Sequence, residues 1–292
     1  MSCSSTLPVS TLPVSTLPVS TLPASTLPVS TLPAPTSPTP SVPDAPEDYP
    51  WTGQAVRSAL LLSTGIADLD PDGGVDAPAE QQDRPLVDVA AIEAGLAADG
   101  AAPLAQRTLV VAVGSNQTPE TIARKYARSG RDLHPATPFV RCTIHDLAVG
   151  HCAHISARGY IPAAPYRAQG ERMELVATWF DDEQLAVVDE TEPNYERIHL
   201  EQGSFPVTLA TGERPRHVDV YASVWGVLAH EEPIPLRHRQ QEIFDELVAL
   251  TGSELVRGDA AGICARLEAD PDALQTLVRE HSLVAEDGLP RG

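Results

Sequence analysis

The chain of 292 residues contains 40 acidic and 20 basic residues, which gives a formal net charge of −20. Because this charge repels phosphate groups, we expect no nucleic-acid partner. No run of about 18 apolar residues occurs, so we expect no membrane-spanning helix. A secretion signal is not recognisable either, since a basic stretch followed by an apolar one is missing. These features predict a cytoplasmic protein.

Cysteine and lysine usage indicates the redox compartment of the protein and the type of genome that encodes it. The cysteines are Cys3, Cys142, Cys152 and Cys264, and no two of them form a C-x-x-C pair. A disulfide framework is therefore not expected, which agrees with a reducing compartment. Lys125 is the only lysine. Together with abundant Ala and Asp, this usage is typical of a GC-rich bacterial genome.

The first segment repeats a five-residue unit. Residues 5–34 are consecutive copies of the unit Ser-Thr-Leu-Pro-Val or Ser-Thr-Leu-Pro-Ala. Proline at every fifth position removes backbone donors and excludes a helix or a central strand. We therefore predict that residues 1–48 form a disordered tail, partly in the polyproline II conformation.

Residues 49–106 are interpreted as a linker with accessory elements. The apolar run Ala59–Leu62 fits either an edge strand or one helical turn. Residues 68–84 are rich in Asp, Gly, Pro and Gln, which is typical of a loop. Val89, Ile92 and Leu96 recur at helical spacing, so a helix is predicted within residues 87–98.

A core domain is predicted over residues 107–255, with a helical extension over residues 256–292. Strands alternate with short helices in the first part of the core. The expected elements are a strand at 108–113, a helix at 119–129 ended by Gly130, and strands at 140–148, 151–156 and 159–164.

The second part of the core opens with strict alternation over residues 171–180. Asp181 and the two acidic residues after it then cap a short helix. Further elements are strands at 195–200 and 218–224, a helix at 240–250, and helical patterns at 263–267 and 272–280. The whole predicts an α+β fold: a small mixed or antiparallel β-barrel, closed or nearly so, with peripheral helices.

Residues 111–117, Val-Ala-Val-Gly-Ser-Asn-Gln, are the clearest candidate for chemistry. An apolar strand leads into a tight turn and then into a helix that begins at Pro119. Such a junction points backbone N–H groups at one spot, where a small anion can bind. Gly114 is expected to supply a positive φ or room for the close approach of a ligand. The alternative is an ordinary strand-to-helix turn.

This junction resembles the Tyr-Gly-Ser-Asn-Leu signature of the gamma-glutamylcyclotransferase superfamily. A second segment, residues 179–197, reads Trp-Phe-Asp-Asp-Glu-Gln-Leu-Ala-Val-Val-Asp-Glu-Thr-Glu-Pro-Asn-Tyr-Glu-Arg. It resembles the family's strand, short helix with Leu-Asp-x-x-Glu-Gly, and Tyr-x-Arg. The resemblance covers roughly residues 107–225. It implies that substrate is bound by Val113, Gly114, Ser115, Asn116 and Gln117.

The chain departs from the family pattern at three positions: Val113 stands for Tyr, Gln117 for Leu, and Pro193 for Gly. The family's catalytic Glu lies on the strand before the short helix. Aligned without gaps, that site falls near Arg172 in one branch and near Val176 in another. Glu174 lies between them on the same strand face, so it is the candidate catalytic residue, and Glu171 is the next to test.

The resemblance implies cyclisation of a gamma-glutamyl or other amino-acyl amine, releasing 5-oxoproline. A desolvated Glu would move the proton between the two amines, and no metal or organic cofactor is implied. The alternative is a non-catalytic protein on the same fold that binds a small molecule or has a structural role. The sequence predicts a small-molecule partner and leaves the oligomeric state open.

Two other site types are considered and not favoured. Cys142, His145, His151, Cys152 and His154 are close in sequence, but their spacing is not a zinc pattern, so no metal is expected. Cys142 and Cys152 are interpreted as small buried apolar residues. Ser115 and Ser156 lack the Gly-x-Ser-x-Gly elbow of a hydrolase nucleophile.

Overall fold

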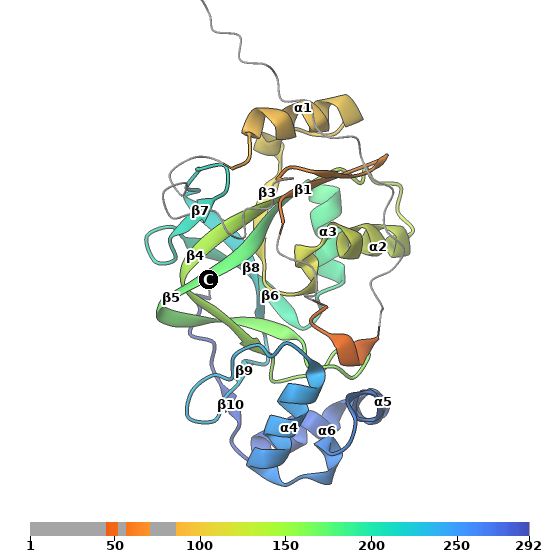
Figure 1. The fold of residues 1–292 in the computed structure, drawn as a ribbon, viewed down its shortest axis with the longest axis vertical. Coiled ribbons are helices and arrows are strands. Elements are labelled where there is room, and N and C mark those ends of the chain that lie inside the picture. The colour runs from red at the N-terminus through yellow and green to blue at the C-terminus, as the bar shows by residue number, and fades with distance from the viewer. Residues whose placement is uncertain (1–44, 52–56, 71–85, 292) are drawn as a thin grey trace, which may run out of the picture. The chain divides into compact units, whose positions relative to one another are not determined.

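The structure, a computed structural model, describes residues 45–51, 57–70 and 86–291. The predicted disordered tail therefore lies outside the described residues, apart from the stretch 45–48. Within the described part, the fold is α+β, with a mostly antiparallel sheet and helices around it (Figure 1).

One sheet contains eight strands in the order β2-β1-β4-β5-β3-β8-β6, with β7 paired to β4. Its strands are β1 (Ala59–Leu62), β2 (Gly65–Asp68), β3 (Thr108–Ala112), β4 (Thr137–His151), β5 (Ala163–Phe180), β6 (Tyr195–Glu201), β7 (Val207–Leu209) and β8 (His217–Ser223). The pair β3–β8 is parallel, and the other pairs are antiparallel. A separate pair joins β9 (Val227–Leu228) to β10 (Val284–Ala285).

The predicted closure into a barrel is not found among the described residues. The order of strands begins at β2 and ends at β6, and these two do not pair. The reason lies at the outer edge of β4. Residues 137–139 of this edge pair with β1, and residues 142–144 pair with β7. No length of that edge is left at these positions for β6, so the sheet stays open.

Within residues 45–51, 57–70 and 86–291, six α-helices accompany the sheet: α1 (Val89–Asp99), α2 (Pro119–Ser129), α3 (Asp182–Glu190), α4 (Gln240–Thr251), α5 (Ala260–Ala269) and α6 (Pro271–Glu280). Helix α2 begins with Pro119 and ends at Gly130, which has a φ of 68°. Helix α3 begins with a capping box between Asp181 and Gln184. None of the helices in the described ranges is long and apolar enough to cross a membrane.

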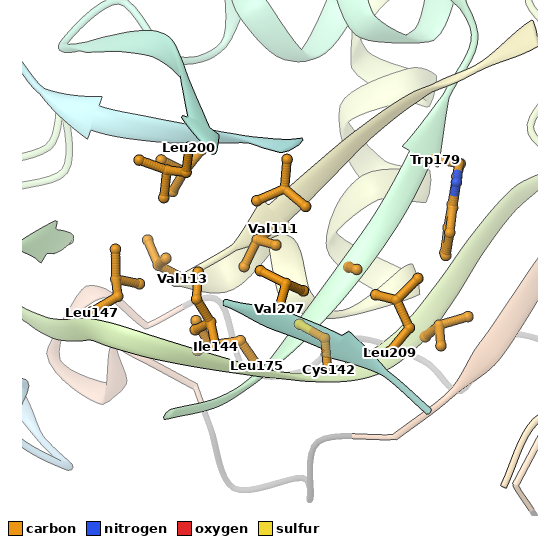
Figure 2. Close-up of a cluster of buried hydrophobic side chains, with 14 of the residues drawn as sticks. Val111, Val113, Cys142, Ile144, Leu147, Leu175, Trp179, Leu200, Val207 and Leu209 are labelled. Atoms are coloured by element: carbon orange, nitrogen blue, oxygen red, sulfur yellow. The ribbon is translucent and has the colours of Figure 1, made fainter. Parts of the chain in front are cut away.

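The alternation of β5 separates two cores, as the sequence predicts. Leu175 and Trp179 belong to the largest buried cluster, together with side chains from β3, β4, β6 and β7 (Figure 2). Val176 and Phe180 point to the opposite face, where Ile122 of α2 and Val188 of α3 cover the sheet. A third cluster holds α4, α5 and α6 together.

Residues 49–106 contain accessory elements of the kind expected, since Ala59–Leu62 is a strand and α1 lies where a helix is predicted; Tyr49, Leu60 and Ile92 are buried in the largest core. One other region differs from the sequence-based expectation. The strands expected at 151–156 and 159–164 are instead the end of β4, a loop and the start of β5. This loop leaves the sheet because Ile155 and Ile161 pack against the cluster of α4, α5 and α6.

Candidate functional site

The junction between β3 and α2 forms as predicted, but Gly114 has a different role from the first one expected. Its φ is −137°, so the expectation of a positive φ is wrong. The second expectation, close approach of a ligand, stays a prediction, but a side chain of the protein itself does come close. A Cβ atom at Gly114 would lie 2.7 Å from the Tyr49 hydroxyl oxygen and 3.4 Å from the Ala163 Cβ. Gly114 is therefore required where a tyrosine side chain meets the backbone.

A cavity of about 300 Å³ opens beside this junction. Its wall combines parts of the chain that are far apart in sequence: the segment before β1, the end of β3, the loop between β4 and β5, and the turn between α3 and β6. Lining residues include Tyr49, Gly114, Ser115, Asn116, Lys125, His154, Arg158, Tyr160, Ala163, Glu192, Asn194, Tyr195 and Tyr221. This volume is at the lower end of the range for small-molecule sites.

Glu192 is the carboxylate of the cavity wall. The Asn116 Nδ2 donates to its Oε1 over 2.9 Å, and the Lys125 Nζ lies 2.6 Å from the same oxygen. The Lys125 and Glu192 side chains are each 16% exposed, so water screens this ion pair less than a surface pair. The Asn116 Oδ1 is buried and has no hydrogen-bond partner among the described residues. Asn116 lines the cavity, although this oxygen atom has no surface open to it.

Two tyrosines hold the opposite wall. The Ala163 N–H donates to the Tyr49 hydroxyl over 2.9 Å, and the Tyr195 hydroxyl donates to the Ala163 carbonyl over 2.8 Å. The Tyr49 ring stacks on Tyr160 at 4.4 Å between centroids. Burial raises the pKa of Tyr49 and of Tyr195 well above the usual value, so both phenols stay neutral hydrogen-bonding groups.

The residues that carry the family resemblance mostly hold the cavity wall together. Asn116 from the first motif contacts Glu192 from the second. Arg197 Nε donates to Asp189 over 3.1 Å, and the Tyr221 hydroxyl donates to the same carboxylate over 2.6 Å. These contacts fix α3 against β6 and β8 behind the cavity. The two motif-like segments are thus joined to each other by hydrogen bonds in the structure.

Glu174 lies elsewhere. It is on β5 opposite Thr143, its side chain is 65% exposed, and Arg172 is 3.5 Å away. It lines a second, more open hollow of about 750 Å³, together with Val113 and Gln117. Of the five predicted substrate-binding residues, Val113 lines both spaces, Gly114, Ser115 and Asn116 line the cavity, and Gln117 lines the hollow. The role of Glu174 as the catalytic residue stays a prediction.

The cysteine and histidine residues singled out from the sequence do not converge. Within the described ranges, no group of three His, Cys, Asp or Glu side chains is placed to hold a metal ion. Cys142 and Cys152 are buried, and burial raises the pKa of each thiol to about 12. The buried His151 Nε2 accepts from the Arg237 N–H over 2.9 Å, and burial lowers its pKa to about 3.

Sequence reasoning missed Tyr49, Lys125 and Glu192 as site residues. Tyr49 lies at the boundary between the predicted tail and linker, and its partner Ala163 is 114 residues away. One local signal was present, since Tyr49 and Trp51 are aromatic residues directly after the proline-rich tail of residues 1–48. Lys125 carried another signal, because a single lysine in an arginine-rich chain stands out.

No protein-family model matches this chain, and no curated protein matches it either. Among solved structures, it is similar to an Arabidopsis thaliana protein determined in solution, with 20% identity and a TM-score of 0.31, over 41% of this chain and 63% of that one. The chain thus spans just under two thirds of that protein.

Two other similar structures align over more of the chain. One is titled gamma-glutamyl cyclotransferase, with 14% identity and a TM-score of 0.34, covering 64% of this chain and 92% of that one. The other is an uncharacterised Homo sapiens protein, with 13% identity and a TM-score of 0.33, covering 64% of this chain and 93% of that one. At these values, the likenesses carry no conclusion about ligand or activity.

Proposed function

We propose that the cavity beside Gly114 binds a small molecule that carries both a hydrogen-bond donor and an anionic group. The observation that carries this proposal is the lining of the cavity, which places the Glu192 carboxylate as an acceptor beside the Asn116 amide. The charged side chains in this lining are Lys125, Arg158 and Glu192, and together they carry one net positive charge, which favours an anionic group.

We further propose that this binding occurs without cyclisation. The resemblance puts the catalytic Glu near Val176 or Arg172. Val176 is a fully buried apolar residue on the face covered by α2 and α3, and Arg172 is exposed. Glu192 is the single carboxylate among the residues lining the cavity, and its Oε1 is already held by Asn116 and Lys125. It serves best as a fixed acceptor.

Cyclisation of a gamma-glutamyl amine is the second candidate function, and one observation favours it. A carboxylate does line the cavity, although it comes from the turn after α3 and not from β5. In that case Glu192 would move the proton from the attacking amine to the leaving amine, and 5-oxoproline would be released.

One titration separates these functions. Amino acids and gamma-glutamyl amines are added to the purified chain in a calorimeter, and the mixtures are then assayed for 5-oxoproline by chromatography. We expect saturable binding without 5-oxoproline. Asn116→Leu should weaken binding at least about tenfold, since the amide is lost at similar volume. Gln169→Leu, in the second hollow, is the matched control.

Two results would contradict the proposal. Binding that is unchanged in Asn116→Leu would show that the Asn116 amide does not contact the ligand. Release of 5-oxoproline would establish the second candidate function instead. The loss of that release in Glu192→Gln or in Glu174→Gln would then identify the catalytic carboxylate.

A further inference from the structure

Three exposed apolar side chains lie on two segments that meet beside the β9–β10 pair. In the described ranges, the exposed large apolar residues are Leu86, Val224, Trp225 and Val284, with exposed fractions of 42%, 54%, 36% and 40%. Val224 and Trp225 follow directly after β8, and Val284 begins β10. A Cβ atom at Gly226, next to Trp225, would lie 3.4 Å from the Val284 Cγ1. We call Val224, Trp225 and Val284 the apolar rim.

The apolar rim borders the cavity through two of the cavity's own lining residues. The Trp225 Nε1 donates to the Asn194 Oδ1 over 3.0 Å, and the Val224 N–H donates to the Asn194 carbonyl over 3.0 Å. The Trp225 ring also lies 5.9 Å from the His154 ring, at an interplanar angle of 35°. Asn194 and His154 both line the cavity. The indole is therefore fixed against two residues of the cavity wall.

His154 makes this border apolar rather than charged. Its side chain is 8% exposed, and burial lowers its pKa to about 4, so the ring is neutral near pH 7. A ligand that leaves the cavity at this side passes a neutral imidazole and then an indole face. Both surfaces favour an aromatic or branched aliphatic group over a charged one.

We propose that the apolar rim is a subsite for an aromatic or branched aliphatic group on the same ligand whose polar end lies in the cavity. This rests on the proposed function, since it extends that site outward. The contacts of Trp225 and Val224 with Asn194 make the rim continuous with the cavity wall. A protein partner fits less well, because a stable interface needs about 800 Å² on each side. Three partly exposed side chains offer much less.

Two probes with the same head test this proposal: gamma-glutamylglycine and gamma-glutamylphenylalanine. Calorimetric titration of the full chain should show about tenfold tighter binding of the phenylalanine compound. In Trp225→Ala this preference should fall to within about twofold, while the affinity for gamma-glutamylglycine stays the same. Trp225→Phe should keep part of the preference, because the ring remains. Leu86→Ala, an exposed apolar residue outside the rim, should keep all of it.

The outcomes separate the two proposals. Equal affinity for both probes in the wild type would overturn the subsite alone, and so would a preference that survives in Trp225→Ala. If neither probe binds the wild type, the proposed function fails for gamma-glutamyl compounds and the subsite fails with it. Thermal unfolding of each variant checks that the fold is kept, which we expect at an exposed position.

Discussion

The cavity and the second hollow meet at Val113 but differ in how their carboxylates are held. In the cavity, Glu192 is 16% exposed and is held by Lys125 and Asn116. In the hollow, Glu174 is 65% exposed and has Arg172 at 3.5 Å. An exposed pair of this kind contributes about 0–1 kcal/mol because water screens it. The comparison teaches that the carboxylate inside the motif-like segment 179–197, Glu192, is also the one held by partly buried partners, whereas Glu174, outside that segment, has only an exposed partner.

The largest expected effect comes from removing the aromatic wall on the cavity side. Tyr49 is 3% exposed, stacks on Tyr160 and accepts the Ala163 N–H. Tyr49→Ala should lower the free energy of unfolding by about 3–5 kcal/mol, as for other buried aromatic residues. Urea titration followed by circular dichroism measures this loss. A loss below about 1 kcal/mol would mean that the wall does not depend on Tyr49.

Acid should destabilise the fold through its buried histidines. In the unfolded chain, His151 binds a proton below about pH 6.5. In the folded chain, burial lowers the pKa of His151 to about 3, so it binds a proton only below that pH. Between these values the unfolded state binds more protons, so stability falls as the pH falls. The expected slope is up to about 1.4 kcal/mol for each pH unit.

His154 acts in the same direction, because burial lowers its pKa to about 4. Urea titrations at pH 7, 6, 5 and 4 measure the slope, and His151→Gln is the control that should reduce it. An unchanged slope in His151→Gln would assign the acid sensitivity to other groups.

A smaller effect is expected where Gly114 meets Tyr49. Gly114→Ala should cost about 1–3 kcal/mol of stability, since the added Cβ would lie 2.7 Å from the Tyr49 hydroxyl oxygen. The same substitution made in Tyr49→Phe should cost less, because the clashing oxygen is gone. A double-mutant cycle by urea unfolding measures this coupling. Additive costs would show that the two residues do not interact.

The smallest expected effect is at the hollow. Glu174→Gln should change stability by less than about 0.5 kcal/mol, since Glu174 is exposed and weakly paired. Glu192→Gln should cost about 1–2 kcal/mol, because Lys125 loses its charged partner in a partly buried site. Parallel urea titrations compare the two. A larger loss in Glu174→Gln would reverse the comparison between cavity and hollow.

Elements with local stop and start signals could be predicted from the sequence nearly to the residue. Helix α2 follows from Pro119 and Gly130, and α3 follows from the capping residue Asp181. The alternation of β5 gave the two faces correctly. Alternation assigns a side chain to a face, however, and does not tell which end of a long strand is covered. Alternation therefore assigns Glu174 to a face of β5 but does not predict its exposure. In the structure Glu174 lies in an exposed stretch of β5.

The rest of the site depends on contacts that leave no local pattern. Tyr49 was not predicted as part of the wall, because nothing near it in sequence indicates its pairing with Ala163 or Gly114. The open sheet was missed for a similar reason, since β1 and β7 occupy the edge of β4 and both are short. Composition and residue spacing do not predict which distant segments a short segment will contact.

The contact between Tyr49 and Ala163 also has a consequence for biosynthesis. The two residues are 114 positions apart, so Tyr49 is synthesised well before its partner. At about 5–20 residues per second, the wait lasts roughly 6–23 seconds. During that time the Tyr49 side chain has no Ala163 peptide to bind, and the cavity has no second wall. The wall of the cavity is therefore complete only after Tyr221, its last lining residue in the chain, has been made.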